Sequence, residues 1–391
     1  MKVAIVAPHI FMQDALLRKV IFSPGTLAID LANELISQGV DVTLCTPGAV
    51  TTTAKNLTAD LSLFEQELQL RGDDYMDLLR KHPLTFITLA RQVQGEILAK
   101  VFTKANDGEF DIVHVYMNEE ELGLTFAALC NKPVVFTHHD PFNFLTRYRS
   151  IMPKHTDHNW LSISLAQRND MPPITNWVEN IYHGLQPDAF KPVQSPVNDY
   201  IAYIGRIIEP KGVHLAIDAV KLYNQQNNAN LKLKIAGKHY SGDKDGYWQR
   251  ILPEIDGGVI QYVDFIDNDQ DKNVFLANAK ALMVPSIFSE PFGMVSIEAL
   301  ACGTPVIGLD SGAIPEVITD GKTGIVVPKV MADKTLNQSA TVAKLAEAIG
   351  RIDSIKRSDC RKDFEERFTI SNMAEKHITA YKKLVSKSST E

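Results

Sequence analysis

The sequence predicts an α/β protein built from two doubly wound parallel sheets. Its 391 residues exceed what one ordinary hydrophobic core accommodates and suit two domains. Short apolar runs alternate with segments of helical spacing from end to end, as expected for parallel strands covered by helices on both faces. The alternation restarts after KPVQSPVND, so we predict domains over residues 1–190 and 191–371, joined near 187–198.

The first half opens with a strand-like run, KVAIVAP, and a helical pattern, TLAIDLANELISQG, which stops at a glycine. The runs DVTLCTP, DIVHVYM and PVVFTHHD predict three further strands. Residues 52–105 show helical spacing without a clear strand, which predicts a helical excursion at the rim of the cleft. An acceptor-binding role and a simple scaffold embellishment both fit this excursion.

The second half repeats the pattern. Strands are predicted at YIAYIGR, LKLKIAGK, IQYVDFI, KALMVPS, TPVIGLD and TGIVVP, with helical segments between them. The tail after residue 368 reads as a helix with a polar end. In two such sheets, ligands are expected at the carboxyl ends of the strands, here in a cleft between the domains.

Composition and charge exclude several classes of function. The chain is 45% apolar and 22% charged, as in a soluble globular protein. Residues 1–190 hold 15 Lys+Arg against 22 Asp+Glu, and residues 191–391 hold 25 of each. A broad basic face for nucleic acid is therefore not expected, and membrane contact should be weak and peripheral at most.

The sequence predicts a cytoplasmic protein. We find no apolar run of 18 residues and no signal peptide in MKVAIVAPHI. The four cysteines lie far apart among apolar neighbours, which favours reduced, buried thiols over disulfides or a metal site. They are Cys45, Cys130, Cys302 and Cys360.

The stretch SEPFGMVSIEALACGTPVIG places two glutamates around the start of a predicted helix. The first amides of this helix, at Gly293, Met294 and Val295, lack partners within it and form an anion site suited to phosphate. Glu290 precedes this site and Glu298 lies about one turn into the helix, so each could accept hydrogen bonds from a sugar or ribose. Alternatively, Glu298 only pairs with a nearby base and Glu290 only caps the helix.

The stretch IGRIIEPKG supplies two cations after a predicted strand. Arg206 and Lys211 follow Gly205 in the loop before the next helix, where they could neutralise a diphosphate, Arg206 by a planar fork and Lys211 as a point charge. The alternative is that both are ordinary solvated loop charges.

Together these motifs resemble the retaining glycosyltransferases of family 4, which have the two-domain GT-B fold. The similarity extends over most of the chain. The matching positions are the Glu-x7-Glu pair Glu290 and Glu298, the loop residues Gly205, Arg206, Lys211 and Gly212, the Gly-x-x-Pro-Glu segment Gly312, Pro315 and Glu316, and the linker residues Ser164, His183 and Gly184. The resemblance also implies that the closing helix, residues 372–391, completes the N-terminal domain.

The resemblance implies a role for each matching position. Glu290 would hold donor-sugar hydroxyls, Glu298 the ribose, and Arg206 and Lys211 the departing diphosphate. His139 in PVVFTHHDPF would lie beside the reacting sugar. The other implied donor-binding residues are Gly25, Gly205, Gly237, Gly293, Met294 and Val295, and the acceptor-side candidates are His114 and His138. The chain departs from the family pattern at Thr26, Lys238 and Asp267, where the family often has glycine.

The resemblance therefore implies a retaining hexosyltransferase that forms an α-glycosidic bond to a carbohydrate or glycolipid hydroxyl without a cofactor or metal. UDP-glucose is the favoured donor on family frequency, and a GDP-mannose-dependent mannosyltransferase stays open. The rivals from other classes are a non-hydrolysing UDP-sugar 2-epimerase and a catalytically silent binding module. The acceptor and the oligomeric state stay open.

Other phosphate and metal motifs are absent or poorly placed in the sequence. No G-x-G-x-x-G follows the first strand and no P-loop pattern occurs, which argues against dinucleotide oxidoreductases and NTPases. Asp-x-Asp strings occur at 243–245, 267–269 and 269–271. Because they lie in polar loops, we interpret them as solvated acidic turns rather than a metal site.

Overall fold

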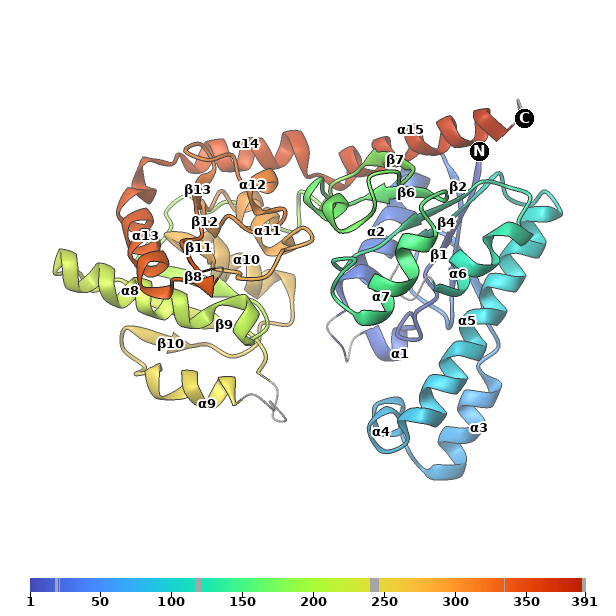
Figure 1. The fold of residues 1–391 in the computed structure, drawn as a ribbon, viewed down its shortest axis with the longest axis horizontal. Helices are drawn as coiled ribbons and strands as arrows, with labels where there is room; N and C mark the ends of the chain where they lie inside the picture. Colours follow the sequence, from blue (N-terminus) through green and yellow to red (C-terminus); the bar gives the residue numbers. More distant parts are fainter. Residues whose placement is uncertain (18–19, 21, 117–120, 240–245, 334, 389–391) are drawn as a thin grey trace. The chain divides into compact units, whose positions relative to one another are not determined.

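The computed structural model describes residues 1–17, 20, 22–116, 121–239, 246–333 and 335–388. Its contacts divide the chain into two compact units, which Figure 1 colours along the sequence. Unit 1 comprises Met1–Ile163, Gln167–Ile181 and Met373–Glu391, and unit 2 comprises Ser164–Ala166 and Tyr182–Asn372. Each unit contains one large parallel sheet, so the predicted two doubly wound α/β domains are confirmed.

Unit 1 contains a seven-stranded parallel sheet in the order β3-β2-β1-β4-β5-β6-β7. Its strands are β1 (Lys2–Val6), β2 (Asp41–Thr46), β3 (Lys55–Thr58), β4 (Ile112–Tyr116), β5 (Val134–Thr137), β6 (Asn159–Ser162) and β7 (Trp177–Asn180). Its helices are α1 (Asp14–Leu17), α2 (Ser23–Ser37), α3 (Ser62–Arg71), α4 (Tyr75–Lys81), α5 (Pro83–Asn106), α6 (Glu121–Phe126), α7 (Thr146–Ile151) and most of α15 (Ile370–Ser388). The central strands β1, β4, β5 and β6 are largely apolar and mostly buried, as expected for a sheet covered on both faces.

The segment 52–105 is only partly the helical excursion that the sequence predicted. It begins with a short strand, β3, which pairs in parallel with β2 and forms the edge of the sheet. The prediction of no strand here was wrong because KNLT is short and polar, as edge strands often are. The second half of α5 packs into the main core through Ile97, Leu98 and Val101, so it is an ordinary crossover helix.

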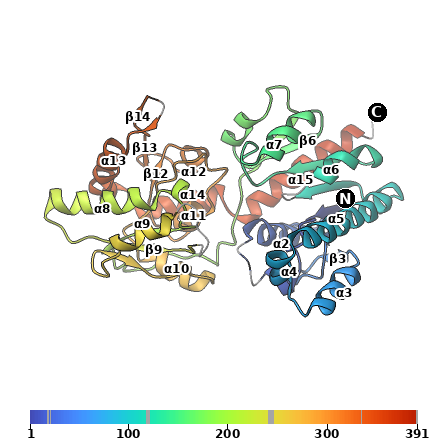
Figure 2. The ribbon, with the colours of Figure 1, turned by 60° about the horizontal axis from the view of Figure 1, so that its bottom comes forward.

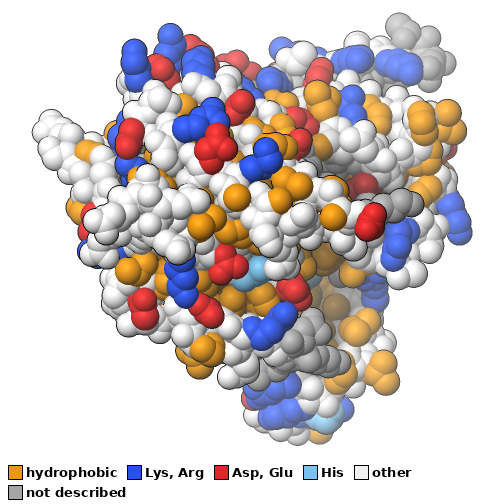
Figure 3. Space-filling model, turned by 60° about the vertical axis from the view of Figure 1, so that its left-hand side comes forward, with side chains coloured by type: hydrophobic (Ala, Val, Ile, Leu, Met, Phe, Trp, Pro, Cys, Tyr) orange, Lys and Arg blue, Asp and Glu red, His pale blue; other side chains and the backbone are white. Residues whose placement is uncertain are grey.

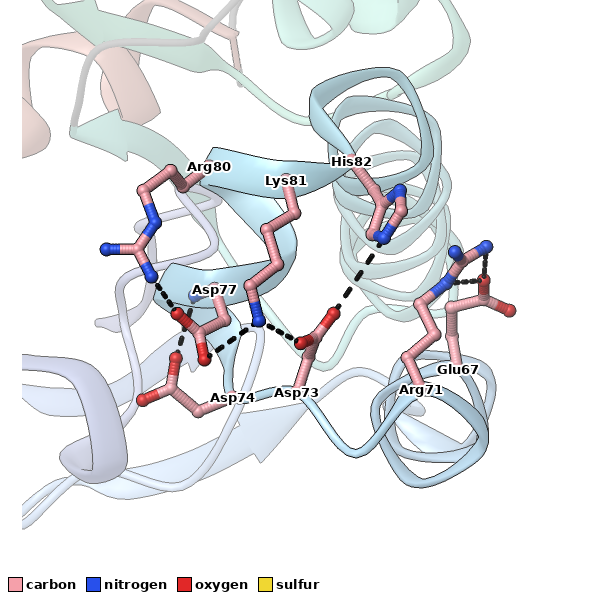
Figure 4. A network of polar contacts seen from close by, with 8 residues as sticks. All are labelled: Glu67, Arg71, Asp73, Asp74, Asp77, Arg80, Lys81 and His82. Atoms are coloured by element: carbon pink, nitrogen blue, oxygen red, sulfur yellow. Dashed lines mark hydrogen bonds and ion pairs between the residues drawn. The ribbon is translucent and has the colours of Figure 1, made fainter.

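The remaining helices α3 and α4 and the start of α5 pack around a separate small apolar cluster that includes Phe64, Leu78 and Phe86. Figure 1 shows them extending away from the sheet of unit 1. Charged residues tie the connections between these helices together (Figure 4). Asp74 caps α4 by accepting a 2.8 Å hydrogen bond from the Asp77 amide, and Lys81 pairs with Asp73.

Unit 2 contains a six-stranded parallel sheet in the order β10-β9-β8-β11-β12-β13. Its strands are β8 (Tyr200–Ile204), β9 (Lys232–Ala236), β10 (Ile260–Tyr262), β11 (Ala281–Val284), β12 (Val306–Leu309) and β13 (Gly324–Val327), with a small hairpin of β14 (Met331–Ala332) and β15 (Thr335–Leu336). Its helices are α8 (Val213–Asn227), α9 (Tyr247–Ile251), α10 (Asp269–Ala277), α11 (Met294–Ala301), α12 (Ile314–Val317), α13 (Gln338–Arg351) and α14 (Arg357–Arg367). Helices α8 and α13 pack against each other (Figures 1 and 2).

Both large sheets have the strand order of the dinucleotide-binding fold. In unit 2, the chain builds outward from β8 to β10 and then returns to the other side of β8 with β11. The direction of winding therefore reverses between β8 and β11. In such sheets, ligands bind outside the carboxyl ends of the strands at this switch point.

The division between the units lies earlier than the predicted boundary at 190/191. The main segment of unit 2 begins at Tyr182, because the residues that follow are already bound to unit 2. The Leu185 amide donates to the Phe368 carbonyl at 2.9 Å, and a Cβ on Gly184 would lie 2.3 Å from the Thr369 carbonyl oxygen. At the other end, Met373–Glu391 groups with unit 1.

The structure also describes the surface charges and the state of the cysteines. On the face shown in Figure 3, acidic and basic side chains are interspersed. All four cysteines are free thiols, and Cys45, Cys302 and Cys360 are buried. Within the described ranges, no helix is both long enough and apolar enough to cross a bilayer.

Candidate active site

Two loops at the switch point of unit 2 carry most of the predicted donor-binding residues. The first runs from Gly205 to Gly212 between β8 and α8, and the second runs over 285–293 between β11 and α11. Because β8 and β11 are neighbours in a parallel sheet, both loops leave the same edge.

A glycine allows these two loops to touch. Gly212 has a φ of +72°, and a Cβ there would lie 2.1 Å from the Pro285 carbonyl oxygen. The Ile287 amide donates to the Pro210 carbonyl at 2.8 Å, which joins the loops further. This close approach brings the neighbouring Lys211 to the second loop.

The Glu290 carboxylate is buried and held at one oxygen. Its Oε1 accepts a hydrogen bond from Lys211 Nζ at 2.6 Å and another from the Ser286 hydroxyl. Its Oε2 accepts no hydrogen bond from any described residue. The Lys211 ammonium also lies 4.7 Å from the centre of the Phe288 ring. Glu290 is therefore oriented, with one oxygen left to accept from a ligand.

The backbone of Glu290 is also fixed from behind. A Cβ on Gly312, whose φ is +60°, would lie 2.2 Å from the Glu290 carbonyl oxygen. The Ala313 amide donates to that oxygen at 2.9 Å, and the Ser164 hydroxyl donates to the Pro291 carbonyl at 2.8 Å. The predicted Gly-x-x-Pro-Glu segment thus supports the loop that carries Glu290.

Helix α11 begins at Met294, as predicted, with Gly293 at its N-cap in the left-handed conformation. No side chain caps this end. The amides of the first turn, including Val295, have no acceptor within the helix and can bind an anion.

Glu298 pairs with a base, as the alternative interpretation expected. Its Oε1 accepts a 3.0 Å hydrogen bond from Lys272 Nζ, while its buried Oε2 has no hydrogen-bond partner. Burial acts to lower the pKa of Lys272, but Glu298 and Asp269 outweigh it and raise that pKa. The Lys272 side chain is therefore a cation. Each glutamate of the pair is consequently held by a lysine at one oxygen and left without a partner at the other.

Arg206 is exposed in the first loop, and its guanidinium makes no ion pair within the described structure. The loop around it depends on Gly237, because a Cβ there would lie 1.9 Å from the Gly205 carbonyl oxygen. The Tyr203 hydroxyl donates to the Arg206 carbonyl at 3.1 Å. The backbone of Arg206 is thus fixed while its side chain stays available.

Sequence reasoning missed the residues that hold these groups in place. Lys272 lies 26 positions before Glu298, so no local pattern links them. Lys329, which follows β13, donates to the Ile287 carbonyl at 2.6 Å and to the Ser311 hydroxyl at 2.7 Å, so the segment after β13 is joined to the second loop. Burial lowers the pKa of Lys329. Ser286 was not predicted either, although it ends the strand-like run KALMVPS.

The predicted histidines lie in unit 1, at or near the carboxyl end of β5. His139 is 7% exposed, with its ring 4.8 Å from the Tyr116 ring. His138 is buried between the rings of Phe142 and Tyr148. Its carbonyl accepts from the Gln167 side chain at 2.8 Å. His139 is thus the more accessible of the two.

His114 is wholly buried within unit 1. Its Nδ1 lies 2.7 Å from the Tyr381 hydroxyl of α15 and its Nε2 2.8 Å from the Thr137 hydroxyl. Burial, aided by His377, holds the pKa of His114 well below its usual value. This placement gives His114 a packing role and keeps it from an acceptor in this structure.

Gly25 lies in the first turn of α2 and is closely packed. A Cβ there would lie within 2.9 Å of side-chain atoms of Met12, Leu17 and Phe22. These are apolar side chains, so the structure explains the glycine by packing. A role beside a phosphate stays a prediction.

The Asp-x-Asp strings at 267–269 and 269–271 form no cluster of metal ligands among the described residues. Asp269 and Asp271 lie in the first turn of α10, and Asn268 caps this helix by accepting from the Asp271 amide. The string at 243–245 lies outside the described residues. In the rest of the chain, no group of three potential metal ligands comes together.

Two family models match the chain. The model described as glycosyl transferases group 1 matches residues 187–352, and the model described as glycosyltransferase family 4 matches residues 25–171. They cover both loops of unit 2 and the histidines of unit 1.

Three curated relatives are 26%, 30% and 29% identical to this chain over the aligned residues. A phosphatidyl-myo-inositol mannosyltransferase of Mycobacterium leprae is 26% identical over 63% of this chain and 67% of the relative. An uncharacterized glycosyltransferase of Methanocaldococcus jannaschii is 30% identical over 46% of this chain and 44% of the relative. An alpha-maltose-1-phosphate synthase of Mycobacterium tuberculosis is 29% identical over 49% of this chain and 53% of the relative. The alignments therefore span about half of the length of the latter two relatives.

Solved structures share the fold over the whole chain. The Anabaena protein HepE, crystallised with UDP and glucose, aligns with a TM-score of 0.67 at 17% identity over 98% of this chain and 100% of its own. A sucrose-phosphate synthase from Thermosynechococcus elongatus aligns with a TM-score of 0.66 at 17% identity over 99% and 100%. Since the family models match both halves and the Glu-x7-Glu pair lies at the switch point, the chain belongs to the family 4 glycosyltransferases of the GT-B fold.

Proposed function

We propose that this glycosyltransferase is a retaining hexosyltransferase that moves a hexose, with UDP-glucose favoured, from a nucleoside-diphosphate donor to a hydroxyl acceptor with an α-linkage. The acceptor is a carbohydrate or glycolipid. The 2-epimerase alternative is set aside because both matching family models describe glycosyltransferases.

The arrangement of Glu290 and Glu298 carries the proposal. Each carboxylate is buried, each has one oxygen held by a lysine ammonium, and each has a second oxygen without a described partner. Carboxylate oxygens accept hydroxyl protons well. The start of α11, which favours anions, lies between the two glutamates in the sequence. This order fits a donor whose sugar, diphosphate and ribose follow one another.

In the proposed reaction, the bond between the anomeric carbon and the β-phosphate oxygen breaks, and the electron pair stays on the phosphate. The acceptor oxygen bonds to the anomeric carbon, and its proton passes to an oxygen of the departing diphosphate. Arg206, Lys211 and the first amides of α11 stabilise the charge that develops on the leaving diphosphate. Preorganised donors aimed at such charge are a large source of catalysis. His139 would assist at the sugar, as the family resemblance implies, and these steps require no metal.

A GDP-mannose donor is the second candidate. Its support is the mannosyltransferase named among the curated relatives. Lys238 and Asp267 stand where the family often has glycine, in the region expected to meet the base. These side chains therefore bear on the choice between uracil and guanine.

Thermal unfolding of the full chain with a donor panel tests the proposal. UDP, UDP-glucose, GDP and GDP-mannose are compared at matched concentrations, because a ligand at 100 times its Kd adds about 2.7 kcal/mol of stability. We expect UDP and UDP-glucose to raise the unfolding temperature most. Transfer of radiolabelled hexose to a set of acceptors, followed by linkage analysis, then identifies the product. Stabilisation by GDP and GDP-mannose alone would favour the second candidate, a mannosyltransferase. If no nucleotide stabilised the protein, the proposed function would be overturned.

A further inference from the structure

We propose that Lys272 is a positioning residue for nucleotide recognition, which orients the Glu298 carboxylate so that its second oxygen accepts a hydrogen bond from the donor's ribose. This inference rests on the proposed function. It adds a residue that no sequence motif indicated.

The geometry around Lys272 supports this role. Lys272 lies in the first turn of α10, at the carboxyl edge of the sheet, and donates to Glu298 Oε1 at 3.0 Å. Its side chain is 21% exposed and that of Glu298 is 9% exposed. Its other ionic partner, Asp269, lies farther away, at 3.5 Å, and is mostly exposed. Lys272 is thus directed mainly at Glu298.

The second oxygen of Glu298 is the observation that points to a ligand. Glu298 Oε2 is buried and accepts no hydrogen bond, whereas buried polar atoms almost always have a partner. The opposite side of the site shows the same design, because Lys211 holds Glu290 Oε1 and leaves its Oε2 without a described partner. Two such carboxylates in one site are better explained by ligand hydroxyls than by two independent structural ion pairs.

The charge of Lys272 matters because a charge-assisted hydrogen bond fixes a carboxylate more firmly than a neutral one does. Without the ammonium, the Glu298 side chain would lose the partner that orients it. Its second oxygen would then be less well placed to accept from a ribose hydroxyl. Removing the ammonium should therefore affect nucleotides with ribose hydroxyls more than nucleotides that lack them.

The test compares the Kd of UDP with that of 2′,3′-dideoxy-UDP by calorimetry on the full chain. The wild type should bind UDP roughly 10- to 100-fold more tightly, the range expected for hydrogen bonds to a charged group. Lys272→Met should reduce this ratio to about threefold or less, and Lys272→Arg should restore most of it. Lys280→Met is the matched control, because Lys280 is similarly buried, at 17% exposure, and pairs with Asp353 beside the amino end of β11.

A double variant keeps the inference testable if Lys272→Met is poorly folded. Glu298→Gln needs no counterion, so Lys272→Met should change the Kd ratio little in the Glu298→Gln background. A Lys272→Met protein that keeps the wild-type ratio would overturn this inference alone. A wild type that binds neither UDP nor GDP would overturn the proposed function and this inference with it.

Discussion

At the scale of single residues, the site depends on charges that the fold holds in place. Glu290 is almost wholly buried, and Lys211 and Ser286 both donate to the same carboxylate oxygen. Arg206, by contrast, is exposed and has no ion pair among the described residues. The orientation of the Glu290 carboxylate is therefore fixed before a ligand binds, whereas the Arg206 guanidinium is available to bind a charged ligand.

Arg206→Ala should lower the rate of hexose transfer by about 10²–10³-fold, because it removes a donor aimed at the charge of the leaving diphosphate. Steady-state transfer with labelled UDP-glucose measures this effect. Unfolding free energy should stay within about 0.5 kcal/mol of wild type, since the side chain is exposed. Arg250→Ala is the control, because Arg250 is an exposed residue that pairs with Glu209 in the same unit. Equal rates in the two variants would contradict the role of Arg206.

Glu290→Gln should lower turnover roughly 10- to 100-fold, because an amide oxygen accepts hydroxyl hydrogen bonds more weakly than a carboxylate. The substitution keeps the side-chain volume, so circular dichroism should show an unchanged fold. Glu209→Gln supplies the matched control, since Glu209 lies in the first loop but its side chain is half-exposed. A Glu290→Gln enzyme with near-normal kcat would remove Glu290 from the catalytic machinery.

At the scale of elements, backbone contacts between loops bring the charges together. Gly212 lets the start of α8 touch Pro285, Gly237 lets the end of β9 touch Gly205, and Gly312 lies against the backbone of Glu290. These contacts involve backbone atoms, so a side chain at any of the three positions would have to displace a loop. The glycines therefore act on the site through loop position.

Gly212→Ala should both destabilise unit 2 and reduce turnover, because the new Cβ would meet the Pro285 carbonyl and move Lys211 away from Glu290. Gly257→Ala separates the two effects. Gly257 has the same φ of +72° but nothing within 4 Å of its Cβ position. Gly257→Ala should therefore lower the free energy of unfolding only by the roughly 1–2 kcal/mol that the left-handed conformation costs. Chemical unfolding and transfer assays compare the two variants. Equal loss of stability with normal turnover in both would contradict the role of Gly212 in placing Lys211.

At the scale of the whole molecule, the two ends of the sequence meet in unit 1. Helix α15 begins in unit 2 and continues into unit 1, where His377 and Tyr381 are buried. Tyr381 contacts His114 of β4, more than 260 positions away. The first unit is thus completed by the last helix of the chain.

Stability should fall as pH decreases from about 6.5 to about 4. Burial lowers the pKa of His377 to about 4, while the unfolded side chain titrates near 6.5. The unfolded state therefore binds more protons across this window, which favours unfolding by up to about 3 kcal/mol at the low end. The groups whose rings face His377 are His114, Tyr116 and Tyr381.

Urea unfolding at a series of pH values measures this dependence. His377→Gln should flatten the slope, leaving the share that arises from His114, whose pKa is also lowered. His82→Gln should keep the wild-type slope, since the His82 side chain is 40% exposed. A His377→Gln slope equal to that of wild type would show that His377 is not buried in its neutral form.

The sequence by itself determined the two parallel sheets and the start of α11. It also indicated Arg206, Lys211, Glu290 and Glu298 as site candidates. Local patterns were enough for this, because alternating apolar runs, glycine turns and charges at strand ends are properties of neighbouring residues. Only the tertiary structure decided which lysine holds which glutamate, that His114 is buried against Tyr381, that β3 is an edge strand and that unit 2 begins at Tyr182. Each of these depends on contacts between segments far apart in the chain. Such contacts leave no periodic pattern in the sequence, because the packing of the folded chain selects the partners.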